Sequence, residues 1–193
     1  MSRRKRRREN SLTSIEIRKI LELFQYARYA RLRYREKKAF HVTELARSIT
    51  SPRSHGRANG AEVGRKAHSE IWSLDPYVVL QEDEVALPFP LAAEVRVEDR
   101  EYIVYGVPDL IKFVRSTPVE VYEFKSYSIA DKYSITQTQI YAWLCHKCFN
   151  NKIKAFLILG WNGRKYSRKI EVKWNKKEVE EELKKAVMKI LGC

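Results

Sequence analysis

The sequence predicts an α/β fold, in which a mixed central β-sheet is flanked by helices and preceded by a helical N-terminal region. Two observations predict this fold. Segments rich in Val, Ile, Tyr and Phe, which favour strands, fill the middle of the chain. Segments with helical apolar spacing open the chain, close it and interrupt the strands. Strands bracketed by helices in this way are expected to form a sheet that the helices cover.

The helices are predicted from their end residues as well as from their apolar spacing. Ser11 or Thr13, together with Glu16, can cap the first of them. The last helix has glutamates in its first half and lysines in its second half, which suits the helix dipole. In chain order, the predicted helices cover 14–38, a short stretch within 41–59, 60–72, 129–149 and 176–191.

The strands are predicted from runs of β-branched and aromatic residues that end at turn signals. Ser116-Thr117-Pro118 predicts a hairpin of the strands before and after it, and Asn162-Gly163 predicts another turn. In chain order, the predicted strands cover 78–87, 93–97, 102–114, 119–125, 153–160 and 168–174. We expect residues 1–10 to be a basic disordered arm and 11–193 to be one domain, helical over 11–75 and built of sheet and helices over 76–193.

The composition is that of a basic, folded domain. A length of 193 residues with 44% apolar content is enough for one sizeable core. The net charge of +14 should attract polyanions, and the cations at 3–8 are expected to contact phosphates, although a nuclear-localisation signal has the same composition. No apolar run approaches membrane-spanning length, and the cationic run lacks the apolar core of a secretory signal. With sparse cysteines, these features favour an intracellular, cytoplasmic protein of archaeal, bacterial or viral origin.

Three charged residues on neighbouring strands carry the main functional signal. Glu123 and Lys125 are two apart on a strand, so they share a face, and the predicted hairpin brings Asp109 beside them. Two carboxylates at one point suit Mg²⁺ or Mn²⁺, and an adjacent ammonium suits a phosphate or the water that attacks it. The pattern therefore predicts metal-dependent phosphodiester hydrolysis. A solvated cross-strand charge pattern is the alternative.

These residues resemble the PD-(D/E)xK nuclease superfamily, with Pro108-Asp109 and Glu123-Phe124-Lys125 as its two signature elements. Gly64-Arg-Lys-Ala-His68 and Gln137-Thr-Gln-Ile-Tyr141 are similar to motifs of its RecB-like branch, and the resemblance covers roughly residues 41–160. It implies a restriction-endonuclease-like core and cleavage of DNA. It also implies that Lys125 positions the attacking water, while Gln137 and Tyr141, on one helix face, orient the lysine or the DNA. The metal ligands that it implies are His68, Asp109, Glu123 and the backbone carbonyl of Phe124.

Within that branch, the chain resembles the exonucleases associated with CRISPR systems. Those proteins hold an iron-sulfur cluster through a Cys-Pro-Arg segment and three cysteines near the C-terminus. Here the segment reads Ser51-Pro52-Arg53, and the cysteines are Cys145, Cys148 and Cys193. Thiols scattered in this way do not make the four-thiolate set of a cluster, so we expect no iron-sulfur cluster. We expect Cys145 and Cys148 to pack in the core instead.

Aromatic and cationic residues are mixed along the first predicted helix. Such a surface can stack and clamp unpaired bases, so it predicts binding of single-stranded DNA or DNA ends. The residues predicted to bind nucleic acid are Arg28, Arg31, Tyr34, Arg53, Arg57 and Arg65. The alternative is an amphipathic helix whose arginines are simply solvated, and the two are compatible.

Two of the candidate site residues, and the function itself, have alternative interpretations. Core packing would account for Tyr141, and a surface or satisfied core position would account for His68. A non-catalytic nucleic-acid-binding protein of the same fold would have the same basic surface, and an RNA-processing nuclease would use the same chemistry. Endonuclease and exonuclease action are both compatible with these residues, as are a monomer and a homo-oligomer.

Overall fold

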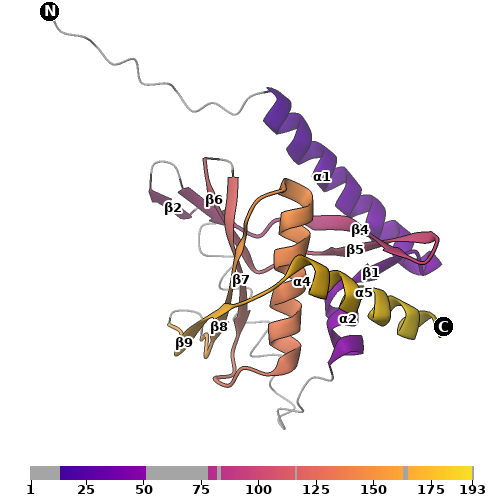
Figure 1. Ribbon diagram of the computed structural model, residues 1–193. Coiled ribbons are helices and arrows are strands. Elements are labelled where there is room, and N and C mark those ends of the chain that lie inside the picture. The colour runs from indigo at the N-terminus through magenta and orange to yellow at the C-terminus, as the bar shows by residue number, and fades with distance from the viewer. Residues whose placement is uncertain (1–13, 51–77, 82–83, 116, 163–164, 193) are drawn as a thin grey trace, which may run out of the picture.

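The computed structural model describes residues 14–50, 78–81, 84–115, 117–162 and 165–192, and Figure 1 labels its elements. The helices are α1 (Ser14–Arg33), α2 (Val42–Ile49), α4 (Lys132–Phe149) and α5 (Lys176–Leu191), with one 3₁₀ turn at Tyr34–Glu36. The strands are β1 (Ala39–His41), β2 (Val78–Gln81), β3 (Glu84–Leu87), β4 (Leu91–Val97), β5 (Arg100–Gly106), β6 (Leu110–Val114), β7 (Thr117–Lys125), β8 (Lys154–Leu159) and β9 (Arg168–Val172). The fold is α/β with helices flanking mixed β-structure, as the sequence predicts.

The described strands form two sheets, whereas we predicted a single central sheet. β1, β5 and β4 make a three-stranded sheet, and the six-stranded sheet has the order β2-β3-β6-β7-β8-β9. The predicted strand 102–114 is divided between them as β5 and β6. It divides at Val107-Pro108-Asp109, because proline has no N–H to give to a central ladder. The predicted strand 78–87 is likewise two strands, the antiparallel pair of β2 and β3.

The main core surrounds α4, which packs against strands of both sheets (Figure 1). β7 and β8 run parallel, and α4 is the crossover that a parallel pair requires. Ile140, Trp143 and Leu144 on α4 are fully buried. α2 and α5 pack against each other, and each of them also contacts α4. Side chains of β7 that face α4 are therefore shielded from water.

Several helix boundaries differ from those predicted from the sequence, and local capping explains some of these differences. α4 begins at Lys132, later than the predicted 129, because Asp131 and Ser134 form a reciprocal capping box. α1 ends at Arg33, earlier than the predicted 38, and Lys37 then adopts a left-handed φ of 55°. The short strand β1, which we did not predict, pairs in parallel with β5. α5 has its predicted bounds, and Asn175 caps it.

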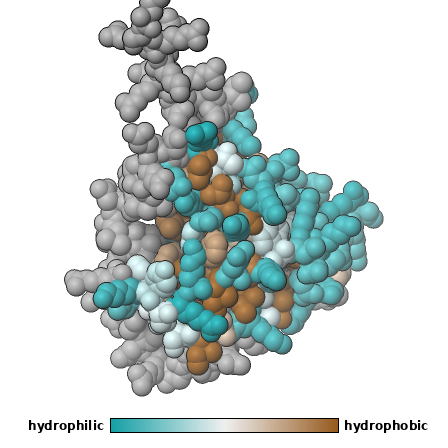
Figure 2. Space-filling view, turned by 60° about the vertical axis from the view of Figure 1, so that its left-hand side comes forward, coloured by the Kyte–Doolittle hydropathy of each residue, from teal (hydrophilic) through white to brown (hydrophobic). Residues whose placement is uncertain are grey.

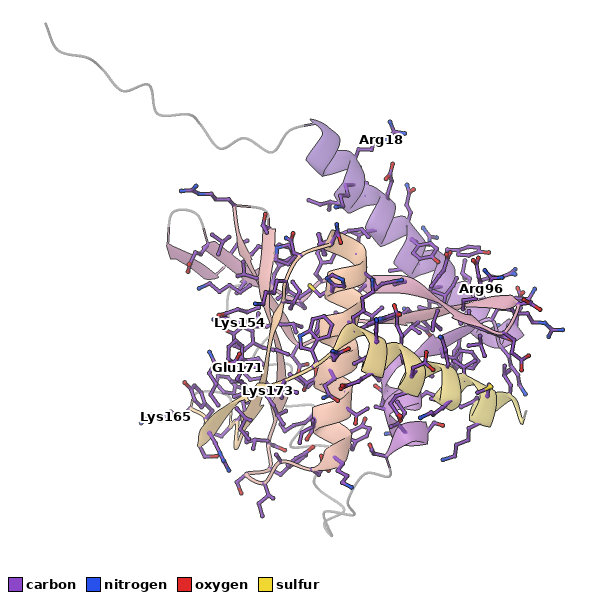
Figure 3. The ribbon with its side chains drawn as sticks, viewed as in Figure 1. Arg18, Arg96, Lys154, Lys165, Glu171 and Lys173 are labelled. Atoms are coloured by element: carbon purple, nitrogen blue, oxygen red, sulfur yellow. The ribbon has the colours of Figure 1, made fainter. Side chains whose placement is uncertain are left out.

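One face of the described part of the molecule is largely polar. Figure 2 shows hydrophilic side chains over much of the described surface on the side that it presents, with apolar areas between them. Lys154 and Lys173 are exposed on the side of β8 and β9 (Figure 3). None of the helices in the described part of the chain has the length and apolar character needed to cross a membrane.

His41 caps α2 with a ring nitrogen. Its Nδ1 accepts a hydrogen bond from the N–H of Thr43 at 3.2 Å. Only the neutral ring can accept at Nδ1, and that ring then has its proton on Nε2. Burial lowers the pKa of His41, which favours this neutral form.

We expect this cap to make stability depend on pH. Because the folded pKa of His41 is lowered, the unfolded chain binds more protons below about pH 6.5, so stability is full above that pH and is lost as the pH falls towards the folded pKa. His41→Asn keeps a cap that does not titrate. Between about pH 7.5 and about pH 5.5, the unfolding free energy in urea should fall by about 1 kcal/mol more in the wild type than in the variant, the contribution of one N-cap. Equal losses would assign the pH dependence to other groups.

Candidate active site

Asp109 lies where the chain passes from one sheet to the other. It directly precedes β6, only 4% of it is exposed, and its Oδ2 accepts a hydrogen bond of 2.7 Å from the N–H of Phe124. The last ladder pair of β6 and β7 joins Leu110 to Tyr122. The carboxylate therefore continues the pairing of this hairpin one step beyond the ladder, and this fixes Asp109 beside Glu123.

Glu123, which is buried, and Lys125, which is partly buried, form an ion pair on β7. Nζ of Lys125 lies 2.8 Å from Oε1 of Glu123, and it donates a second hydrogen bond of 2.8 Å to Oε1 of Gln137 on α4. Only 3% of Glu123 is exposed, so the ammonium of Lys125 offsets a charge that is costly to bury. The backbone is held as well, because the N–H of Trp161 donates to the carbonyl of Lys125 at 3.0 Å.

The charge of Lys125 is determined by the two carboxylates. Burial by itself lowers the pKa of this ammonium, but Glu123 and Asp109 outweigh burial and raise the pKa above its usual range. Lys125 is therefore a cation at neutral pH. It can donate hydrogen bonds and neutralise charge, and it does not act as a proton acceptor.

Asp109, Glu123 and Lys125 together form what we call the acid cluster. Gln137 and Tyr141 lie one turn apart on α4, and both reach this cluster. Tyr141 is 3% exposed and Gln137 is 6% exposed. Burial raises the pKa of Tyr141, and so do the charges of Glu123 and Asp109, while a hydrogen bond with the side chain of Gln137 lowers it. The phenol consequently stays protonated. Tyr141 has both of the roles that the sequence left open. Its ring packs in the main core, and its hydroxyl lies at the cluster.

The backbone of Gly106, the last residue of β5, lies against the side chain of Tyr141. A Cβ at this position would lie 3.0 Å from Cε1 of Tyr141, 3.2 Å from its hydroxyl oxygen and 3.0 Å from Cγ2 of Val42. Both neighbours are buried, so neither can move without displacing the core.

We expect Gly106→Ala to lower the free energy of unfolding by about 1–3 kcal/mol, the usual effect of overpacking. Tyr141 must then leave its present position, so any activity that depends on its hydroxyl should fall as well. Urea unfolding measures the first effect, and Tyr141→Phe, which removes only the hydroxyl, calibrates the second. A Gly106→Ala protein as stable as the wild type would contradict the close packing of Gly106 on Tyr141.

The cluster has the ligand chemistry of a site for a small divalent cation. Asp109 and Glu123 supply two buried carboxylates beside the ammonium of Lys125. Mg²⁺ binds through one or two carboxylates and keeps several waters, which this pair can satisfy. No group of three or more His, Cys, Asp or Glu side chains within the described ranges is arranged to hold a metal. The other implied ligands are the carbonyl of Phe124, on the same strand, and His68, which lies outside the described residues.

A groove runs beside this cluster, between α1 and the end of β5. It has a volume of about 510 Å³, and Arg28, Arg31, Tyr105, Gly106 and Val107 are among its lining residues. Two of the predicted nucleic-acid-binding residues therefore face the segment that leads to Asp109. The third, Tyr34, has its ring 6.4 Å from that of Tyr105, in an edge-to-face arrangement.

The remaining predicted nucleic-acid-binding residues, Arg53, Arg57 and Arg65, lie outside the described residues. His41 and Tyr105 line the groove and were not predicted from the sequence. Neither belongs to a motif. Their rings meet edge to face at 5.2 Å only because β1 pairs with β5, and a three-residue strand leaves no periodic pattern in the sequence.

Cys145 and Cys148 pack on the side of α4 that faces β4. Cys145 is fully buried, and the thiol of Cys148 donates a hydrogen bond of 3.3 Å to the carbonyl of Ala92. Burial raises the pKa of Cys148 to about 11, so its thiol is protonated at neutral pH. This is the core packing that we predicted for the two residues.

Comparisons with known proteins do not assign the chain to a family. No family model matches it, and no curated protein matches it. Six chains of solved structures match. One of these, described as "Crystal structure of SSO0001", has 21% sequence identity and a TM-score of 0.48, over 78% of this chain and 76% of that chain. A likeness of this degree concerns the fold alone.

Proposed function

We propose that this protein is a metal-dependent nuclease that hydrolyses phosphodiester bonds in DNA, acting on single strands or ends. The observation that carries the proposal is the placement of Lys125, whose ammonium bridges Glu123 and Gln137 while Asp109 is fixed beside them by the N–H of Phe124. Two buried carboxylates and a partly buried cation at one point are costly unless they serve a ligand or a reaction.

Each residue of the cluster has a distinct task in this reaction. Asp109 and Glu123, with the carbonyl of Phe124, would hold the cation, which when bound would acidify a water and neutralise charge on the phosphate. Two of the three N–H groups of Lys125 are taken by Glu123 and Gln137, so the third can donate to the attacking water or to a phosphate oxygen. The protonated hydroxyl of Tyr141 is a further donor at the same place.

A purely binding protein is less well supported by the same geometry. Buried carboxylates repel a phosphate unless a cation lies between them, so they would weaken a simple clamp. RNA remains a competing substrate, because it differs from DNA at the 2′-hydroxyl and the hydrolysis is the same. RNA of matched sequence therefore belongs in the first assay.

The test is cleavage of single-stranded and double-stranded DNA, labelled at the 5′ or the 3′ end, together with the matched RNA. Chelator-treated protein is assayed with Mg²⁺, Mn²⁺ or EDTA. We expect cleavage only with metal, and a fall of about 100-fold or more in Glu123→Gln, which has nearly the same shape as the wild type. Lys154→Gln/Lys173→Gln, altered on the side of β8 and β9, should cleave normally. Salt-sensitive binding without metal-dependent cleavage of any substrate would make the protein a non-catalytic binder.

A further inference from the structure

The groove beside the acid cluster has two arginines that no other described residue neutralises. Arg28 and Arg31 are exposed on α1 and line the groove. Other arginines of the same helix are paired, Arg18 with Glu22 at 3.0 Å and Arg33 with Glu36 at 2.9 Å. Within the described ranges, Arg28 and Arg31 form no ion pair of this kind. Two uncompensated guanidinium groups in a groove are suited to an anionic ligand, and guanidinium matches phosphate especially well.

The same groove presents ring faces and apolar surface. Phe24 is 46% exposed and Val107 is 42% exposed, although both are large apolar residues. The His41 and Tyr105 rings complete the wall. Since Nδ1 of His41 is occupied by the N–H of Thr43, its Nε2–H is a donor on the ring. Rings next to arginines are the combination that binds unpaired nucleotides, because a base whose face is open can stack.

The groove and the acid cluster share a wall. Gly106 and Val107 line the groove, and Pro108 and Asp109 follow directly in the chain. Gly106 also lies against the ring of Tyr141, whose hydroxyl feels the charges of Glu123 and Asp109. A strand lying in the groove at Val107 would therefore lie two residues along the chain from Asp109.

We propose that this groove holds one unpaired strand of nucleic acid next to the bond to be cleaved, with phosphates on Arg28 and Arg31 and a base against Phe24 and Tyr105. The proposal rests on the nuclease function, since the strand is its substrate. A duplex does not fit this chemistry, because its base faces are stacked on one another and cannot contact the rings.

The first test measures binding in EDTA, so that cleavage plays no part. A fluorescein-labelled oligothymidylate is titrated, at several salt concentrations, with the wild-type protein and with the groove variant Arg28→Gln/Arg31→Gln. The control, Lys154→Gln/Lys173→Gln, loses the same charge on the side of β8 and β9 (Figure 3). We expect the groove variant to reduce the dependence of log K on log salt by about 1.4, as the loss of two single-strand phosphate contacts should, and the control to leave it unchanged. Equal losses in the two variants would overturn the proposal.

The second test locates the base. Phe24→Ala should weaken oligothymidylate binding by about 5- to 150-fold, the range for the loss of one stacked base, and should change duplex binding much less. Crosslinking of an oligonucleotide with 5-iododeoxyuridine should label a peptide that contains His41 or Tyr105. Crosslinks confined to other peptides, with unchanged binding by a folded Phe24→Ala protein, would place the strand elsewhere.

The two proposals fail in distinguishable ways. If metal-dependent cleavage is observed but the groove variant binds and cleaves as the control does, the nuclease stands and the groove does not. If no substrate is cleaved but the groove variant alone loses single-strand binding, the groove stands and the nuclease does not. Thermal unfolding of every variant separates both outcomes from loss of the fold.

Discussion

Asp109→Asn is expected to lower the rate of DNA cleavage by about 100- to 1000-fold while leaving the fold intact, because one charge that acts on the reacting phosphate is removed. The amide oxygen of the new residue can still accept the hydrogen bond from the N–H of Phe124, so the backbone of the hairpin keeps its geometry. Single-turnover cleavage with saturating Mg²⁺ or Mn²⁺ measures the rate, and anisotropy in EDTA measures DNA binding, which should be close to that of the wild type.

Asp109→Ala is the matched comparison, since it removes the hydrogen bond as well as the charge. The N–H of Phe124 is then left without the partner that it has in the native protein, at a cost of about 1–3 kcal/mol in the free energy of unfolding. Both variants should lose cleavage to at least this extent, and only the alanine variant should be destabilised. Wild-type cleavage by Asp109→Asn would remove this residue from the reaction.

Lys125→Met is expected to be the most destabilising change at the cluster. It keeps the apolar stem but leaves Glu123 and Asp109 buried without their cation, and breaking a buried pair in this way typically costs about 3–5 kcal/mol. Because a divalent cation can replace the missing positive charge, Mn²⁺ or Mg²⁺ should restore more stability to Lys125→Met than it adds to the wild type. Urea unfolding in EDTA measures the loss of stability, and urea unfolding with Mn²⁺ or Mg²⁺ measures how much of it the metal restores.

The double variant Glu123→Gln/Lys125→Met provides the control for this prediction. It removes both partners of the buried pair, so it should be less destabilised in EDTA than the sum of the single changes, and metal should help it little. If Lys125→Met unfolded like the wild type in EDTA, or if metal stabilised the single and double variants equally, the carboxylates would not depend on the ammonium as the structure indicates.

The acid cluster could be predicted from the sequence because its information is local. Alternation along β7 puts Glu123 and Lys125 on one face, and one helical turn separates Gln137 from Tyr141, so each pair is fixed by a regular period. The hairpin of β6 and β7 then brings Asp109 within reach by a short loop. These relations hold in any fold that keeps the two elements, which is why they did not require the correct sheet arrangement.

The division into two sheets depends on longer-range packing. Apolar and aromatic residues on both sides of 107–109 mask the interruption, and Pro108 was the signal in the sequence that opposed a single central strand. β1 is too short to show a pattern, and its partner β5 is distant in the chain. The groove could not be predicted for the same two reasons. It lies where α1 and β1 meet the end of β5, and neither β1 nor the end of β5 was predicted from the sequence.

The connection between the two sheets also limits how the chain can vary in length. Gly106 is held in one sheet and Leu110 in the other, so inserting or deleting a residue between them would move Asp109 out of reach of Phe124 while both sheets kept their own pairing. The turn at Glu98 and Asp99, which joins two strands of the same sheet at the surface, carries no such restriction. Indels at these two places should thus differ sharply in their effect on cleavage, a contrast that a library of point substitutions cannot reveal.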